Sequence, residues 1–501
     1  MYQRNFFSKW GGAPALFARH SALGLSFFED SAQMNLTITI DFGSTYTKIA
    51  AFDLDNAELV GTAQAKTTAD SDITIGFQEA IIQLKKNIKS RGKTFSIQRM
   101  LSSSSAAGGL RMIAIGLTKA LTTKAAEEAA LGAGAKLIGA YSLQLTSEDI
   151  TAIETKNPDL ILLAGGIDGG NEKNIIMNAQ ALAQSSVQSP IIIAGNRTAA
   201  STVYSILEKA GKYAIIVENI LPELDQLNTE PARETIRKIF IDRIIHAKGF
   251  DKAREMTGGI IMPTPMAVLK GAGLLSKGFK SESGWGDLLV IDIGGATTDV
   301  HSFGYGRPSQ VDTILKGLPE PWDKRTVEGD LGIRFNAPTI FEKMKEEISD
   351  TTHITGTADA TINIDSYVEY VATHTGHIAH DEKEYRIDST LAAKAVETAM
   401  RRHVGKIEER YFPSGKVKVQ CGKDLTGCQS LIGVGGILTY GQNPGGILKS
   451  ACFQYAHPEY LCPLSPIFWV DQCYILFATG LLSEIASLTA LKILKKNLKK
   501  I

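Results

Sequence analysis

Two short stretches of the sequence each place a carboxylate, glycines and hydroxyls within a few residues of one another. In DLLVIDIGGATTDV (287–300), an apolar run ends in Asp292, and Asp299 follows after a glycine turn. TITIDFGSTYTKIAAFD (37–53) repeats this pattern, with Asp41 at the end of its apolar run. Both stretches predict two strands joined by a tight turn. A pair of such turns could hold one ligand between them.

The residues of the two turns suit phosphate and magnesium binding. Glycine lets backbone N–H groups approach a phosphate without a Cβ in the way, and hydroxyls add donors. A carboxylate would repel the phosphate unless a cation lay between them, and Mg²⁺ is held by one or two carboxylates plus phosphate oxygens. The predicted phosphate-binding residues are Gly43, Ser44, Thr45, Thr47, Lys48, Gly294, Gly295 and Thr298. The predicted metal ligands are Asp41, Asp292 and Asp299, and the predicted catalytic residues are Asp41, Asp292 and Thr297.

A third glycine-rich turn follows the apolar residues SLI (430–432). Gly433, Gly435 and Gly436 would let a planar base and its ribose lie against the backbone. Each of the three signals is weak alone, because a single D-x-G-[ST] turn is usually ordinary turn chemistry, and Lys48 could be a plain surface lysine. Together and in this order, they predict ATP or ADP with Mg²⁺ as the ligand.

Composition excludes several other classes of protein. The chain has 501 residues, which predicts two to four domains, and Lys+Arg equals Asp+Glu at 53 each. This balance gives no field that favours nucleic acid or a membrane surface. Five cysteines without a C-x-x-C pair indicate free thiols and a cytoplasmic location. No apolar run is expected to span a bilayer, because Asp471 interrupts the nearest one, at 466–482.

Apolar runs alternate with helical patterns between residues 105 and 221. RMIAIGL, KLIGAYS, DLILLAGG, PIIIAGN and YAIIVENI are predicted strands, and the segments between them have helical spacing. Unbroken apolar strands at this spacing predict a parallel sheet with helices on both faces. Residues 105–221 are therefore predicted to be an inserted, doubly wound module. Residues 1–35 are predicted to be a disordered leader.

The order of hairpin, hairpin and glycine turn resembles the superfamily of actin, sugar kinases and heat-shock chaperone ATPases. MPTPMAVLKGAGLLSKG (262–278) and DQCYILFATGLLSEIASL (471–488) stand where that superfamily has its two connecting helices. The resemblance implies an α/β fold: two actin-like ATPase lobes, duplicated and ribonuclease-H-like, with the inserted module. The implied division is 36–104 for lobe I, 222–285 for a helical segment with the first connecting helix, 286–470 for lobe II and 471–501 for the last helix.

Within the superfamily, the chain resembles the MutL/GlmL accessory proteins of adenosylcobalamin-dependent glutamate (methylaspartate) mutase. DFGSTYTK, LLAGGIDGGN, PIIIAGN, MPTPMAVL and DIGGATTDVHS carry this resemblance over about residues 36–490. It implies an ATP-binding, chaperone-like reactivating factor that helps a mutase exchange damaged cobalamin. The implied partners are the subunits of such a mutase, and a homodimer is left open. A small-molecule kinase and an actin-like filament or cell-division ATPase are the alternatives.

The chain departs from related patterns at two places. The inserted module resembles the cobalamin-binding subunit of the mutases, but IGLTKALTTKAAEEA (115–129) contains no cobalt-ligating histidine. Met262 stands where the heat-shock chaperones have a glutamate near the attacking water, so either another acid serves or ATP hydrolysis is slow. His374, His377 and His380 are three residues apart, which on a helix would place them on one face. They could bind a metal, but solvent-facing histidines are the favoured interpretation.

Overall fold

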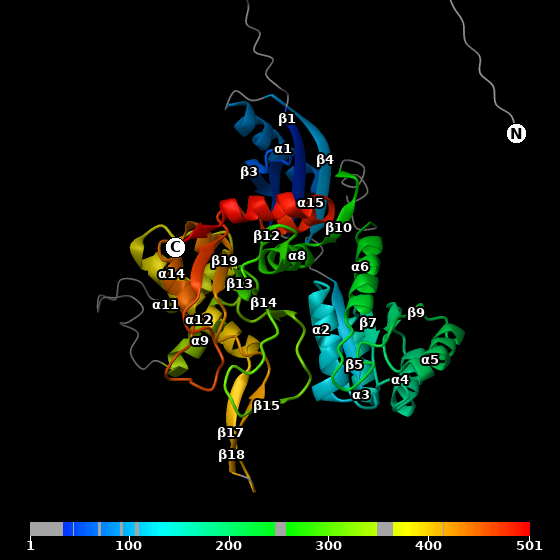
Figure 1. Ribbon diagram of the computed structural model, residues 1–501. Coiled ribbons are helices and arrows are strands. Elements are labelled where there is room, and N and C mark those ends of the chain that lie inside the picture. The colour runs from blue at the N-terminus through cyan, green and yellow to red at the C-terminus, as the bar shows by residue number, and fades with distance from the viewer. Residues whose placement is uncertain are drawn as a thin grey trace, which may run out of the picture.

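The computed structural model describes residues 34–43, 45–68, 72–90, 94–105, 110–245, 257–347, 364–413 and 415–501. Residues 1–33 of the predicted leader, and Ser44 of the first turn, lie outside the described residues. Two lobes carry one glycine-turn hairpin each, and two helices cross between them (Figure 1). A separate α/β module lies beside the second lobe and is inserted into the first (Figure 1).

Lobe I is built on a five-stranded mixed sheet in the order β10-β4-β1-β2-β3. Strands β1, β2 and β3 are antiparallel, whereas β4 and β10 run parallel to β1. Half-buried and exposed residues alternate along β3 from Gly61 onward, and β1 is buried on both faces. Helix α1 packs on one face and begins after Asp72, whose side chain accepts from the N–H of Thr74. The bounds are β1 (Met34–Phe42), β2 (Tyr46–Asp53), β3 (Glu58–Lys66), α1 (Ile73–Lys89), β4 (Phe95–Ser104) and β10 (Ile260–Pro263).

Lobe II repeats this strand order, with β16-β14-β13-β19-β20 followed by β21. The first three strands are again antiparallel, and β19 and β20 run parallel to β13. The strands are β13 (Leu288–Ile293), β14 (Thr298–Phe303), β16 (Asp323–Glu328), β19 (Ser430–Val434), β20 (Ile467–Val470) and β21 (Lys499–Lys500). The main helices are α9 (Ala337–Glu347), α11 (Ile364–Thr373), α12 (Glu382–His403), α13 (Gly436–Tyr440) and α14 (Pro444–Lys449). The shared connectivity confirms the predicted pair of duplicated lobes.

The inserted module has five parallel strands in the order β6-β5-β7-β8-β9. Alternate residues of each strand pack on opposite faces, against α2 and α6 on one side and α3, α4 and α5 on the other. This 2-1-3-4-5 order is that of a doubly wound sheet, and α6 extends the module beyond its predicted end at residue 221. The strands are β5 (Arg111–Gly116), β6 (Lys136–Ser142), β7 (Leu160–Leu163), β8 (Ile191–Ile193) and β9 (Ala214–Ile216). The helices are α2 (Lys124–Gly132), α3 (Ser147–Lys156), α4 (Lys173–Gln184), α5 (Arg197–Lys209) and α6 (Glu230–Ile245).

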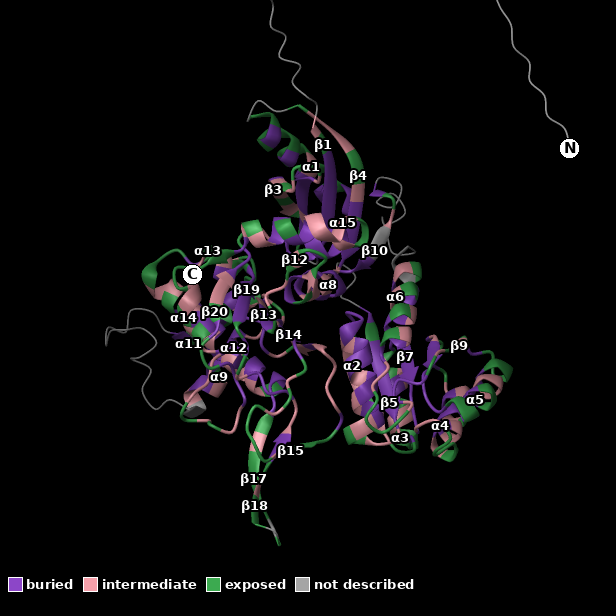
Figure 2. Cartoon of the chain, viewed as in Figure 1, coloured by how far each residue is buried: buried purple, intermediate pink, exposed green. Residues whose placement is uncertain are grey.

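Two helices, α8 (Thr264–Lys277) and α15 (Leu476–Asn497), connect the lobes and pack closely on each other (Figure 1). The facing residues are buried (Figure 2). Glycine is required at the crossing, because a Cβ on Gly271 would collide with the carbonyl of Leu476, and one on Gly480 with the carbonyl of Ala267. Helix α15 also bends at Ala486, whose backbone is non-helical with φ −152° and ψ 60°.

Helix α15 corrects the expectation that no apolar run could span a bilayer. With 22 residues, it is long enough and apolar enough to cross a membrane by length and composition. Among the described helices it is the only one that meets both criteria. However, 56% of its most apolar window is buried inside the protein. Packing against α8 accounts for that apolar face, as in the core helix of a globular protein. The histidine segment differs as well: α11 ends at Thr373, so His374, His377 and His380 follow the helix rather than share one of its faces.

The crossing of α8 and α15 gives a stability prediction. Gly480→Ala should lower the free energy of unfolding by about 1–3 kcal/mol, because a well-packed backbone contact must open to admit the methyl group. Gly427→Ala is the matched control, since a Cβ there meets no heavy atom within 4 Å. Thermal unfolding of both variants measures the difference. Equal melting temperatures would show that the helices do not cross at this distance.

Candidate nucleotide cleft

The first hairpin places an acid and a lysine side by side. Asp41 at the end of β1 lies directly across from Lys48 on β2. Asp41 Oδ1 accepts a hydrogen bond of 2.5 Å from the hydroxyl of Thr264, the first residue of α8. Burial raises the pKa of Asp41, and the charge of Lys48 and the Thr264 bond offset part of this rise. The first acid is therefore fixed to the start of a connecting helix.

The second hairpin has two acids in the corresponding positions. Asp292 on β13 lies directly across from Asp299 on β14. Arg325 on β16 donates to Asp299 Oδ2 at 2.7 Å, while the buried Oδ1 has no hydrogen-bond partner among the described residues. Asp292 makes no side-chain hydrogen bond to the described part of the chain. Burial, followed by the charge of Asp299, raises the pKa of Asp292 to about 6. This pair has the charge and the open oxygen atoms that a cation would satisfy.

Backbone bonds hold the turn of the second hairpin open for a ligand. The Gly294 N–H donates to the carbonyl of Thr297 at 2.9 Å and closes the turn. The carbonyls of Gly294 and Gly295 accept from the N–H groups of Ile333 and Arg334 at 3.2 and 3.0 Å. Among the described residues, nothing accepts from the N–H groups of Gly295, Ala296 and Thr297. Successive unpaired amides of this kind form an anion-binding concavity.

Two of the predicted hydroxyl donors lie on the opposite face of their sheets. Thr47 pairs with Phe42, and Thr298 pairs with Ile293, so both point away from the acids. Both are fully buried. The Thr47 hydroxyl bonds to that of Thr67 at 3.1 Å, and the Thr298 hydroxyl donates to the carbonyl of Leu331 at 2.7 Å. These hydroxyls stabilise the fold, whereas Thr45 and Thr297 remain exposed or half-buried at the turns.

The first turn requires glycine, since a Cβ on Gly43 would lie 2.5 Å from the carbonyl oxygen of Tyr46. In the third turn, Gly435 has a φ of 116°, and a Cβ there would collide with the carbonyl of Ile293 in the second hairpin. Gly436 follows as the first residue of α13. Gly433 has a different role, because it lies within β19 and makes room for Leu438 and Leu448 of the core.

Residues around the cleft that the sequence did not single out are Thr264, Arg325, Asp471 and Tyr474. Asp471 was noted only as a break in an apolar run, but it is buried and caps α15, accepting from the N–H groups of Ile475 and Leu476 at 3.1 and 2.8 Å. Tyr474 follows it and lies under the ammonium group of Lys48. Asp471 stands before the N-cap residue Ile475 and outside the usual capping position, so the capping pattern of the sequence could not have identified it.

No group of three or more His, Cys, Asp or Glu side chains in the described part of the chain could hold a metal by itself. The described residues therefore do not bring the predicted ligands Asp41, Asp292 and Asp299 together as one such group, and a magnesium ion there would need phosphate and water to complete its shell. In the histidine segment, His377 bonds to Glu384 at 3.0 Å and His374 stacks on Tyr370. The interpretation of that segment as a metal site therefore gains no support.

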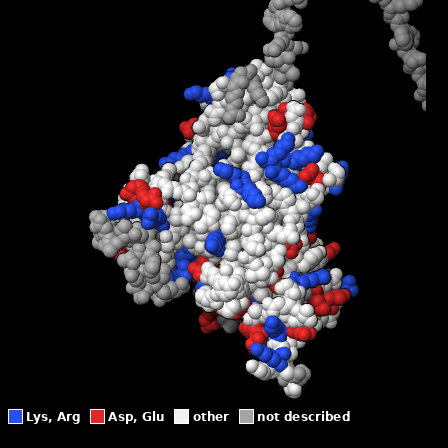
Figure 3. All heavy atoms as spheres, turned by 60° about the vertical axis from the view of Figure 1, so that its left-hand side comes forward, with Lys and Arg blue, Asp and Glu red and all other residues white. Residues whose placement is uncertain are grey.

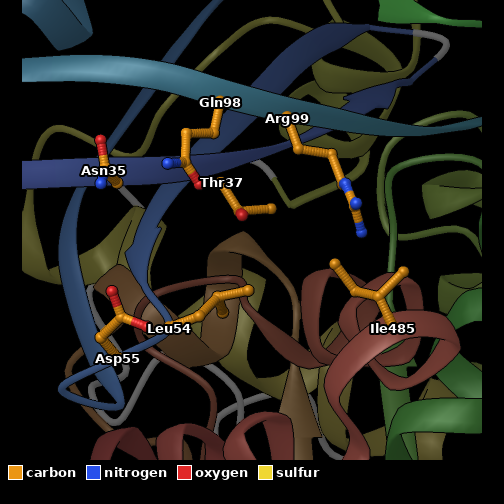
Figure 4. Close-up of a pocket in the computed structure, with 7 residues that line it drawn as sticks. All are labelled: Asn35, Thr37, Leu54, Asp55, Gln98, Arg99 and Ile485. Atoms are coloured by element: carbon orange, nitrogen blue, oxygen red, sulfur yellow. The ribbon is translucent and has the colours of Figure 1, made fainter. Parts of the chain in front are cut away.

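Two surface features lie outside the cleft. A hollow of about 460 Å³ lies between the lobe I sheet and α15 (Figure 4). Its lining residues are Asn35, Thr37, Leu54, Asp55, Gln98, Arg99 and Ile485. Acidic and basic side chains are interspersed over the face drawn in Figure 3. That distribution matches the balanced charge of the sequence.

Comparison with known proteins gives the family. Residues 37–498 match the family model described as MutL protein. The chain belongs to the MutL protein family. Protein MutL from Clostridium tetanomorphum is 45% identical to it over 473 residues, which cover 93% of this chain and 100% of that protein.

Among solved structures, this MutL-family chain is similar at the level of fold to three remote proteins. The ethanolamine utilization protein EutJ from Carboxydothermus hydrogenoformans is 10% identical, with a TM-score of 0.27 and coverage of 91% of this chain and 89% of that one. Glycerol kinase with ADP from Plasmodium falciparum is 9% identical, with a TM-score of 0.33 and 93% coverage of each chain. Xylulose kinase from Bifidobacterium adolescentis is 12% identical, with a TM-score of 0.31 and coverage of 93% and 94%.

The Asp292–Asp299 pair gives a pH-dependent prediction for the MutL-family chain. Because the folded-state pKa of Asp292 is raised to about 6 from 3.8, its ionisation should destabilise the fold as pH rises from about 4 to 6. Asp292→Asn should therefore raise the stability by roughly 1–2 kcal/mol at pH 7 and leave it unchanged at pH 4. Thermal unfolding in EDTA measures this, with the exposed Asp55→Asn as control. A variant that is less stable at pH 7 would contradict the raised pKa.

Proposed function

We propose that the protein is an ATP-binding, chaperone-like reactivating factor for an adenosylcobalamin-dependent mutase, with glutamate (methylaspartate) mutase as the client. The observation that carries the nucleotide part is the pairing of two acid-tipped hairpins, one of which has three backbone amides without an acceptor among the described residues. Membership of the MutL family, together with the resemblance of the sequence motifs to mutase accessory proteins, supports the choice of client. The five free thiols suit a cytoplasmic location.

In this proposal, different residues of the cleft bind the metal, the phosphates and the nucleoside. Asp41, Asp292 and the free oxygen of Asp299 would share a magnesium ion with phosphate and water, and the amides of Gly295, Ala296 and Thr297 would bind phosphate oxygens. Lys48 adds a positive charge from lobe I, and the turn at Gly435 and Gly436 contacts the nucleoside. Bound magnesium would neutralise phosphate charge between the two hairpins.

Slow hydrolysis follows from the side chain at position 262. Met262 is fully buried in the core between the lobes, and methionine can neither orient a water molecule nor accept a proton. The working event would then be binding and release of nucleotide, with movement of the lobes about α8 and α15. A differential affinity of a few kcal/mol between open and closed states is enough for such a switch.

A chain of contacts links the second hairpin to the inserted module. Arg325 donates to Asp299 through one side of its guanidinium group and to the carbonyls of Leu131 and Ala135, at 3.3 and 3.4 Å, through the other. Leu131 lies in the last turn of α2, the first helix of the module. Arg233 on α6 adds a second tie, bonding both carboxylate oxygens of Asp323 at 3.1 and 2.9 Å. A ligand that contacts Asp299 would thus alter the position of Arg325 and, through it, the last turn of α2.

The module itself would dock onto the client. It has the parallel, doubly wound sheet expected of a cobalamin-subunit mimic. The segment after β5, where the mutase subunit carries its cobalt-binding histidine, contains Lys119–Thr123 and α2 without a histidine. The module could therefore occupy the position of that subunit without retaining the cofactor through cobalt.

Reactivation of a mutase tests the function directly. A cyanocobalamin-inactivated mutase is incubated with the protein, ATP, Mg²⁺ and fresh adenosylcobalamin, and turnover is measured. We expect activity to recover with the wild-type protein and not with Asp292→Ala, while Asp55→Ala behaves as the wild type. Phosphorylation of an added small molecule would support the kinase alternative. ATP-dependent pelleting would support the filament alternative.

The Arg325 contacts give a separate prediction. Magnesium nucleotide should slow amide hydrogen exchange in the last turn of α2, and Arg325→Met should abolish that protection even at saturating nucleotide. Arg410→Met, on the exposed strand β17 (Lys406–Phe412), is the control. Undiminished protection of α2 in Arg325→Met would show that the module does not respond through this arginine.

A further inference from the structure

Lys48 contacts an aromatic ring although several carboxylates are near it. Its charge acts on the carboxylates of Asp41, Asp292 and Asp471, which converge from both lobes. No carboxylate oxygen of the described residues lies within salt-bridge distance of its ammonium group. Instead, Lys48 Nζ lies over the ring of Tyr474, 4.1 Å from the centroid. This is a cation–π contact across the cleft, from β2 of lobe I to the segment that starts α15.

Tyr474 is held in an unusual backbone conformation at this place. Its φ is 51°, in the left-handed region that residues with a side chain rarely adopt. The preceding Asp471 fixes the start of α15, and the Tyr474 hydroxyl faces Gly436, where a Cβ would lie 3.7 Å from it. A strained residue that is held by its surroundings points to a functional demand on its side chain.

We propose that Tyr474 is a positioning residue for Lys48. The ring attracts the ammonium group without neutralising any carboxylate. Lys48 is thereby kept from pairing with Asp41, Asp292 and Asp471, and it stays available to a phosphate, while the acids stay available to a divalent cation. The contact also joins phosphate recognition in lobe I to the start of the helix that leaves lobe II. This inference rests on the nucleotide-binding role proposed above.

A double-mutant cycle tests the positioning role. The dissociation constant of MgADP is measured by calorimetry for Tyr474→Leu, Tyr474→Phe, Lys48→Met and the Lys48→Met/Tyr474→Leu double variant. Loss of the ring should weaken binding about threefold to tenfold, because it removes one cation–π interaction. Tyr474→Phe should bind like the wild type, and Tyr474→Leu should have no further effect once Lys48 is replaced. Tyr411→Leu, a substitution of an exposed tyrosine far from the cleft, should change nothing.

Three results would overturn the proposal: tighter or unchanged binding by Tyr474→Leu, a loss in Tyr474→Phe as large as in Tyr474→Leu, or independent effects of the two substitutions. A second cycle on the same variants measures unfolding by urea without nucleotide. Coupling in that cycle reports the Lys48–Tyr474 contact itself, and additive effects would disprove it. If the wild type bound no nucleotide, the proposed function would fail, whereas the urea cycle would still decide the contact.

Discussion

The structure of the cleft depends on the repulsion between two carboxylates, Asp292 and Asp299, that face each other on paired strands. In lobe I, the acid at the end of the first strand lies across from a lysine, whereas the same position in lobe II places a second acid, Asp299, beside Asp292. Arg325 forms an ion pair with only one of the lobe II acids, Asp299. The duplicated lobes are therefore electrostatically unequal, because the second hairpin alone places two acids directly across from each other.

The rest of the fold connects the acids of the cleft to the two helices that join the lobes. The strand order of each sheet brings its first two strands, and hence each hairpin, to the cleft. Thr264 links the first acid to α8, and Asp471 fixes the start of α15, so both connecting helices begin at side chains of the cleft. Close packing at Gly271 and Gly480 lets these helices cross with little space for deformation. Such a packed crossing favours discrete arrangements over continuous bending.

Local patterns in the sequence predicted the hairpins and the parallel module, because each depends on neighbours in the chain. The roles of Thr47 and Thr298 were missed, although strand alternation places them opposite the acids. Gly433 was assigned to the ligand, but tertiary packing of Leu438 and Leu448 explains it. Arg325 and Tyr474 could not be found this way, since their partners lie far away in the sequence. A helix through the histidine segment was considered although Gly376, a local stop signal, follows the end of α11 at Thr373.

The place of the insertion has an evolutionary consequence. The chain leaves lobe I after β4 and returns in β10, and these two strands are hydrogen-bonded parallel neighbours, with Ser104 beside Pro263. The chain leaves at the end of β4, Ser104, and re-enters at the start of β10, Ile260, which pairs with Ser102, so both connections lie near the same end of β4. A segment attached in this way can be exchanged as a cassette without disturbing the register of the host strands. Related chains could thus acquire a different module by replacing one contiguous stretch of coding sequence.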